Sequence, residues 1–131
     1  MARGKNQHDE RKRAVAALGK NLSRRARSRC ELCGERHPLT VIEVDPVDED
    51  PHEDAAMLAC ETCREALSAK RLDPSSLRFL ETAVWEDPMP TKIAAITLLR
   101  RLQDDDIQWA REVLDGLWLD EAVEQRLERL Q

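Results

Sequence analysis

CELCG (residues 30–34) and CETCR (residues 60–64) are two Cys-x-x-Cys motifs, and 26 residues separate the last cysteine of the first from the first cysteine of the second. A spacing of two residues lets one tight turn direct both sulfur atoms to the same point, and two such turns can surround a zinc ion tetrahedrally. Gly34 follows the first pair, where glycine tolerates the positive φ that such turns often need. We therefore predict a closed, structural zinc site whose ligands are Cys30, Cys33, Cys60 and Cys63.

The same four cysteines have other uses that must be weighed against zinc. Disulfides are typical of oxidising compartments, and a single Cys-x-x-Cys redox motif accompanies a βαβ pattern that this sequence lacks. Iron in a rubredoxin-like site takes the same four ligands. The second motif lacks the glycine of the first, and aromatic residues make up only 3% of the chain, which disfavours the rubredoxin-like fold. An iron electron carrier stays as an alternative to the zinc protein.

The segment between the motifs predicts a small β element. Residues 39–44 (LTVIEV) are rich in β-branched side chains and predict a strand, which we expect to form a hairpin with the first motif. The stretch from Asp45 to Asp54 is acidic and contains two prolines, so we expect an exposed loop. Residues 55–59 then lead back to the second motif, which we expect to run into a helix at Arg64.

The two flanks of the motifs predict helices. Residues 1–12 are polar and are expected to fray, whereas apolar side chains recur at helical spacing from Arg13 to Leu22. After residue 66, apolar side chains at steps of three and four predict a series of short helices, with starts near Asp73, Thr91, Ile107 and Asp120. Three tryptophans are expected to anchor this helical body: Trp85, Trp109 and Trp118.

The predicted fold class is therefore α+β. We expect a basic arm and helix over residues 1–29, a zinc-ribbon or treble-clef-like module over residues 30–66, and a helical domain over residues 67–131 packed on that module.

Charge is distributed unevenly along the chain. Residues 1–29 carry ten basic and two acidic side chains, a net charge of +8, whereas residues 30–131 carry a net charge of −13. A basic arm of this kind binds nucleic acid, or it folds back onto the acidic body. The candidate nucleic-acid contacts directly precede the first motif and are Arg24, Arg25, Arg27 and Arg29. A further alternative is an adaptor whose acidic helical body recruits a basic protein partner.

Length and composition bound the class of protein. A chain of 131 residues is too short for a TIM barrel, which needs about 200 residues or more. No apolar run approaches the roughly 18 residues of a membrane span, and the charged N-terminus does not resemble a secretory signal. We therefore expect a cytoplasmic protein without a membrane partner, in which thiols stay reduced.

Taken together, these motifs resemble the PhnA-like family, described as alkylphosphonate-utilisation-operon proteins with an N-terminal zinc ribbon. The resemblance covers roughly residues 11–128 and is carried by residues 28–34, 39–46, 58–63, 85, 96–102 and 109–121. It implies that the four cysteines occupy the family's zinc positions. Many members carry a further SH3-like β domain after the helices; we expect none in this chain, and the biochemical function of the family is not established.

Two enzyme activities can be compared with this pattern. The label phosphonoacetate hydrolase, attached to the family, belongs to an unrelated enzyme with a two-metal site of Asp and His ligands. Such a site needs open coordination positions and several imidazoles, whereas this chain has only His8, His37 and His52. We therefore do not expect that activity.

The layout from Arg25 to Cys63 also resembles zinc-containing HNH nucleases. Their catalytic His stands at the strand end, where this chain has Val44, followed by Asp45 and Pro46. A degenerate HNH-like nuclease stays as an alternative to a non-catalytic zinc-binding protein.

Overall fold

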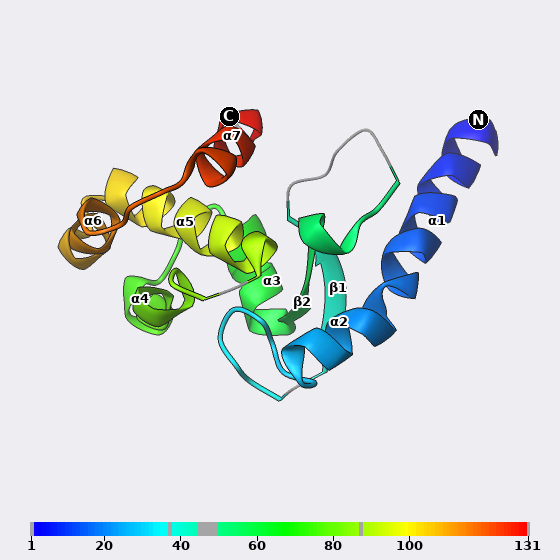
Figure 1. Ribbon diagram of the computed structural model, residues 1–131, viewed down its shortest axis with the longest axis horizontal. Helices are drawn as coiled ribbons and strands as arrows, with labels where there is room; N and C mark the ends of the chain where they lie inside the picture. Colours follow the sequence, from blue (N-terminus) through cyan, green and yellow to red (C-terminus); the bar gives the residue numbers. More distant parts are fainter. Residues whose placement is uncertain (1, 37, 45–49, 87, 131) are drawn as a thin grey trace.

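The structure is a computed structural model that describes residues 2–36, 38–44, 50–86 and 88–130, with side chains from residue 7 onward. These residues form an α+β fold that is mostly helical and holds one two-stranded sheet, as the sequence predicts (Figure 1). The elements in chain order are α1 (Ala2–Ala17), α2 (Gly19–Ala26), β1 (Leu39–Glu43), η1 (Glu53–Ala55), β2 (Ala56–Cys60), α3 (Glu61–Ser68), η2 (Pro74–Leu77), α4 (Leu80–Ala83), α5 (Met89–Asp104), α6 (Gln108–Asp115) and α7 (Glu121–Arg129).

The N-terminal arm is helical from Ala2, which corrects the expectation that residues 1–12 fray. This stretch has no proline and is rich in Arg, Lys, Gln and Glu, all of which favour a helix. The helix breaks at Leu18, whose N–H donates to the carbonyl of Val15, and α2 then continues to Ala26. Figure 1 shows α1 and α2 on the side of the sheet away from the helical body.

The sheet pairs β1 with β2 in antiparallel register, from Leu39 opposite Cys60 to Glu43 opposite Ala56. The partner of β1 is therefore the segment that leads into the second motif, not the first motif as the sequence suggested. All five residues of β2 are buried, so this strand lies at the centre of the module. Of the predicted acidic loop, residues 45–49 lie outside the described residues, and the part that follows contains η1.

The helical body is built around α5, which contributes nine buried residues to the core. Helices α4, α6 and α7 pack against it, and the same buried cluster includes Met57 of β2 and three of the cysteines, Cys30, Cys60 and Cys63. Helix α5 begins at Met89, two residues before the expected start at Thr91, and Thr91 is buried inside its first turn. None of the described helices combines the length and the apolar character needed to cross a membrane.

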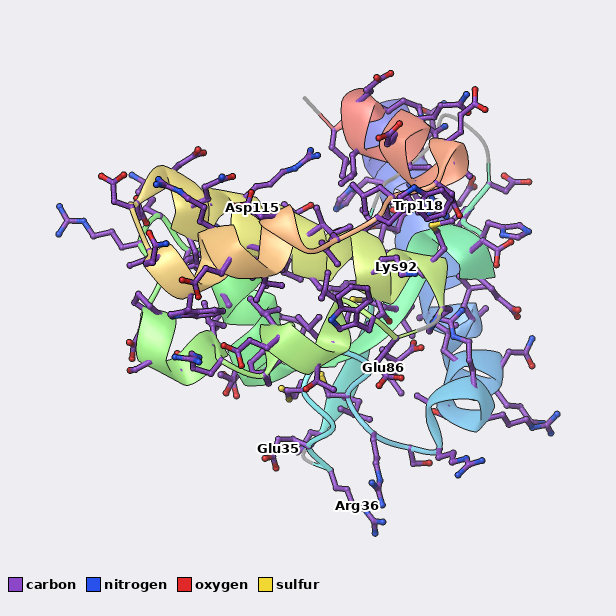
Figure 2. The ribbon with its side chains drawn as sticks, turned by 60° about the vertical axis from the view of Figure 1, so that its left-hand side comes forward. Glu35, Arg36, Glu86, Lys92, Asp115 and Trp118 are labelled. Atoms are coloured by element: carbon purple, nitrogen blue, oxygen red, sulfur yellow. The ribbon has the colours of Figure 1, made fainter. Side chains whose placement is uncertain are left out.

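Two of the three tryptophans do not anchor the core as expected. The exposed fractions are 58% for Trp85 and 83% for Trp118, whereas Trp109 is half-buried and lies under the guanidinium of Arg78, 4.8 Å from the ring centre. Trp118 lies in the connection between α6 and α7 (Figure 2), where its neighbours Leu117 and Leu119 take the inward positions.

Candidate metal centre

The four cysteines of the two motifs meet at one point. Each offers one Sγ atom, and all four of these atoms lie within 4.8 Å of one another. The Sγ atoms of Cys33 and Cys60 are 3.6 Å apart, close to the ~3.8 Å that separates two thiolates on one tetrahedral zinc ion. This distance is far beyond a disulfide bond of about 2.05 Å, and the four cysteines are free thiols. The site therefore has the size and the ligand set for one metal ion.

The first pair is positioned by a tight turn. The N–H of Gly34 donates to the carbonyl of Cys30, and the N–H of Cys30 donates to the carbonyl of Glu35, both at 2.9 Å. Gly34 has a φ of 85°, in the region that favours glycine. The role predicted for this glycine is thus confirmed, and Leu32 between the cysteines is buried beneath the turn.

The second pair is positioned by the junction of a strand and a helix. Cys60 ends β2 and precedes α3, and Cys63 lies in the first turn of that helix. The helix therefore begins three residues before the expected Arg64. The partial positive charge at a helix N-terminus stabilises nearby thiolates, so the start of α3 suits the thiolate form that these sulfur atoms adopt once a metal is bound.

The thiol pKa values show how strongly the four sulfur atoms interact. A hydrogen bond from Cys63 lowers the pKa of Cys30 to about 4. Burial raises the pKa of Cys33 to about 12. The hydrogen bond to Cys30, followed by burial, raises the pKa of Cys63. Because four adjacent thiolates repel one another, binding of a metal dication displaces protons from this site.

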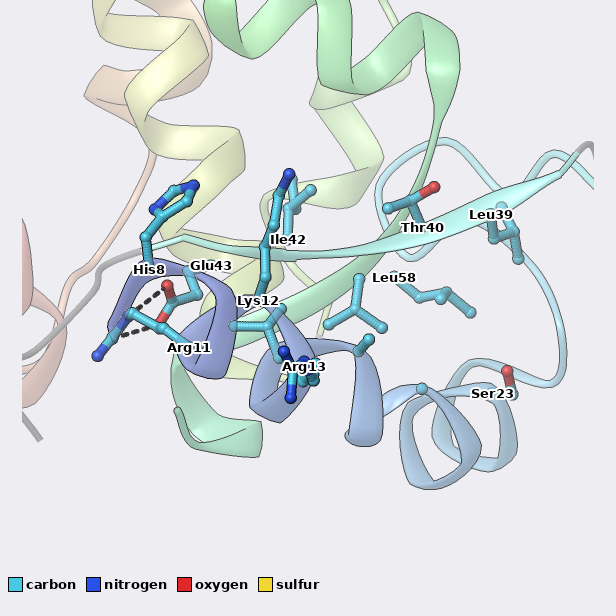
Figure 3. A pocket seen from close by; sticks show the side chains of 14 residues that line it. His8, Arg11, Lys12, Arg13, Ser23, Leu39, Thr40, Ile42, Glu43 and Leu58 are labelled. Carbon is cyan, nitrogen blue, oxygen red and sulfur yellow. Dashed lines mark hydrogen bonds and ion pairs between the residues drawn. The ribbon is translucent and has the colours of Figure 1, made fainter. Parts of the chain in front are cut away.

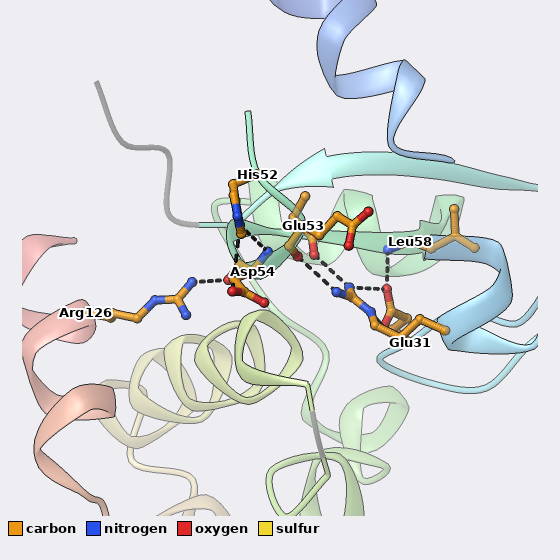
Figure 4. Close-up of polar contacts among 8 residues, drawn as sticks. Glu31, His52, Glu53, Asp54, Leu58 and Arg126 are labelled. Atoms are coloured by element: carbon orange, nitrogen blue, oxygen red, sulfur yellow. Dashed lines mark hydrogen bonds and ion pairs between the residues drawn. The ribbon is translucent and has the colours of Figure 1, made fainter. Parts of the chain in front are cut away.

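A buried ion pair fixes the first pair against β2. The carboxylate of Glu31 is only 3% exposed and accepts two hydrogen bonds from Arg25, at 2.9 and 2.8 Å, and one from the N–H of Leu58, at 2.9 Å. Arg25 also donates to the carbonyls of Glu53 and Ala56, each at 2.9 Å (Figure 4). This network joins α2, the first motif and the strand that ends at a ligand, so it holds the two halves of the metal site together.

Sequence reasoning placed Arg25 among the nucleic-acid contacts and assigned no role to Glu31. Two features of the sequence could have revealed this pair. Glu31 is an acidic residue between the cysteines of the first motif, and Arg25 lies six residues before it and three residues after the apolar Leu22. Residues three positions apart share a helix face, so Arg25 lies on the side of α2 that buries Leu22.

The other three candidate arginines lie on the surface. Arg24 is in the last turn of α2, Arg27 adopts a left-handed conformation at its C-cap, and Arg29 precedes the first cysteine; all three are exposed. None of them forms an ion pair with a described residue. Arg29 lines a cavity of about 580 Å³ beside the first motif, which Cys33 also lines. Their contact with nucleic acid stays a prediction.

The histidines do not join the cysteine group in the described part of the chain. His8 is exposed on α1, and His52 precedes η1, where its Nδ1 accepts from the N–H of Asp54 at 3.0 Å. His37 lies outside the described residues. Val44 stands at the strand end with its side chain packed against the core, so it offers neither a base nor a metal ligand there.

Comparisons of the chain with protein-family models, with curated proteins and with solved structures found no match. The resemblance to the PhnA-like family therefore stays a prediction from the motifs.

Proposed function

We propose that this chain is a non-catalytic zinc-binding protein in which one structural zinc ion is held by Cys30, Cys33, Cys60 and Cys63. The observation that supports it best is the convergence of four Sγ atoms within 4.8 Å, with three of the four cysteines buried and one half-buried. Four thiolates complete a tetrahedral shell, which leaves no position for a reactive water. When bound, zinc cross-links the turn of the first motif (residues 30–34) to the junction of β2 and α3.

The difference in backbone structure between the two motifs favours zinc over a rubredoxin-like iron site. One pair lies in a glycine-closed turn, whereas the other lies where β2 becomes α3. This arrangement supports the treble-clef-like module, because a rubredoxin-like site would repeat the glycine-closed turn. The residue pattern of the motifs also supports our proposal that the chain is a member of the PhnA-like family.

We propose nucleic acid as the partner of this module, with Arg24, Arg27 and Arg29 as the contacts to phosphate. These guanidinium groups are exposed and lie beside the turn that the metal organises. If each contacts one phosphate of a duplex, the logarithm of the binding constant falls with the logarithm of salt concentration with a slope of about −2.7.

The experiment has two parts. Elemental analysis and an absorption spectrum of the purified protein identify the metal: one zinc per chain without colour supports the proposal, and iron with visible absorption contradicts it.

Fluorescence anisotropy with a labelled DNA duplex and a labelled RNA then compares the native protein with the triple variant R24A/R27A/R29A, in which Arg25 is kept because it supports the metal site. The matched control is K70A/R71A, two exposed cations after α3. Equal affinity and salt dependence for native protein and triple variant would reject these arginines as the contact surface.

A further inference from the structure

A second surface of the protein lies between α1 and β1, on the face of the sheet that presents Val41 and Leu58. A groove with a volume of about 810 Å³ runs there (Figure 3). Its floor is apolar and includes Val15 of α1, Val41 of β1 and Leu58 of β2. The volume lies within the range of about 300–1,000 Å³ that is typical of ligand clefts. The metal ligands do not line this groove, so it is distinct from the site described above.

One wall of the groove is the unpaired edge of a strand. The N–H of Val44 donates to the carbonyl of Ala55, at 2.8 Å, and therefore faces β2. In an antiparallel ladder, alternate residues face the partner, so Thr40 and Ile42 also face β2, whereas the backbone groups of Val41 point away from it. The sheet of the described residues has no third strand on that side. The N–H and C=O of Val41 thus have no backbone partner among the described residues, and such an edge is a template for a further strand.

The other wall of the groove is cationic. His8, Lys12 and Arg13 of α1 line it and are exposed, and none of the three forms an ion pair with a described residue. At one end of the groove, Arg11 of α1 is bound to Glu43 of β1, which ties the helix to the strand (Figure 3). The charge of this wall complements an acidic ligand.

We propose that this groove binds an extended acidic segment of a partner protein, which pairs with β1 as an added strand. Backbone hydrogen bonds to the edge at Val41 provide affinity, because strand addition satisfies peptide groups on both chains. Successive side chains of a strand point to opposite sides, so aliphatic residues at every second position contact the apolar floor. Acidic side chains of the segment reach the exposed cations of α1 beside this floor.

The charge of the cationic wall distinguishes an acidic peptide from a second copy of the chain as the occupant of this groove. Pairing β1 with β1 of another copy would bring two cationic walls together, and like charges repel across such an interface. An acidic peptide gains from the same charges. This groove is a different surface from that of the proposed nucleic-acid contacts, and peptide binding to it does not depend on them.

The test uses the metal-loaded protein and a fluorescein-labelled peptide in which glutamate and valine alternate. We expect saturable binding by fluorescence anisotropy. The double variant K12E/R13E reverses the charge of the cationic wall, and we expect its affinity for the peptide to be lower by about tenfold or more. K20E is the matched control, because Lys20 is an exposed cation of α2 that does not line the groove, and it should leave the affinity unchanged.

A second pair of probes tests the strand pairing itself. Val41→Pro removes an N–H that points away from β2, which an edge strand tolerates, and we expect it to weaken peptide binding while circular dichroism and zinc content stay native. A peptide N-methylated at alternate residues tests the same bonds without altering the protein and should not bind. Equal binding of the methylated and the unmethylated peptide, or of a lysine–valine peptide and the glutamate–valine one, would overturn the proposal. So would a homodimer in sedimentation analysis that Val41→Pro dissociates.

Discussion

The ion pair between Arg25 and Glu31 allows the sharpest test of how the fold supports the metal site. Replacing Arg25 with Met retains the apolar stem but leaves the Glu31 carboxylate, 3% exposed, without its cation. Breaking a buried pair in this way costs about 3–5 kcal/mol. The two carbonyls that also lose a donor, those of Glu53 and Ala56, add to this cost. Because the Arg25 side chain is itself 24% exposed, we expect a loss near the lower end, about 3 kcal/mol of the free energy of unfolding.

The double variant R25M/E31Q separates charge burial from lost packing. The neutral carboxamide that E31Q introduces still accepts a hydrogen bond from the N–H of Leu58 and leaves no buried charge. We therefore expect the double variant to recover at least half of the stability that R25M loses, since much of the loss comes from an uncompensated carboxylate. Urea denaturation at a fixed free zinc concentration measures the free energies, because metal bound only to the folded state adds to apparent stability.

The same variants test whether the pair positions the metal ligands. Removing a group that orients a metal ligand typically costs 10–100-fold in affinity, and competition with a chromophoric chelator measures this for R25M. Arg11→Met is the matched control, because Arg11 also binds a carboxylate, that of Glu43, but those two side chains are 34% and 19% exposed and lie away from the cysteines. A smaller loss of stability in R25M than in R11M, or a double variant R25M/E31Q no more stable than R25M, would refute this role of the ion pair.

Three further predictions concern the metal site and the core. Cys30→Ser leaves three thiolates, and we expect a sharp fall in zinc affinity together with loss of hydrogen-exchange protection in β1 and β2; unchanged exchange would show that the site is not structural. Because Cys33, with a pKa of about 12, and Cys63, whose pKa is also raised, hold their protons at neutral pH without metal, zinc binding releases both. Apparent zinc affinity should therefore rise by at least about 100-fold per pH unit between pH 6 and 8, measured with a pH-calibrated chelator; a flat profile would contradict the release of these two protons. Thr91→Val replaces a buried hydroxyl that has no hydrogen-bond partner among the described residues. We therefore expect the free energy of unfolding, measured by urea titration, to rise by about 1 kcal/mol. A fall in this free energy would show that the hydroxyl has a hydrogen-bond partner in solution.

The metal ligands were predictable from sequence because their geometry is local. A two-residue spacing brings two sulfur atoms together whatever the rest of the chain does, and Gly34 supplied the conformational signal for the turn. The strand near residues 39–44 was also predictable, since its β-branched residues favour extended backbone. β2 offered no such signal, because AMLAC (Ala56–Cys60) has no β-branched residue. It is extended because it pairs with β1 and is buried along its whole length, which is a property of tertiary structure.

The arginines show the same limit for charge. Arg24, Arg25 and Arg27 have the same charge and lie within one turn of chain, so composition assigns them one role. Their environments differ because successive residues of a helix point in different directions. Arg25 lies on the same face of α2 as the buried Leu22, whereas Arg24 and Arg27 are exposed. The buried carboxylate of Glu31 and the carbonyls of Glu53 and Ala56 accept the hydrogen bonds of Arg25 and make that position stable. Glu31 is held in place because it lies in the turn between Cys30 and Cys33. A charge count therefore overstates how many unpaired cations the arm can offer to a polyanion, because Arg25 is bound to Glu31 and connects the arm to the metal site.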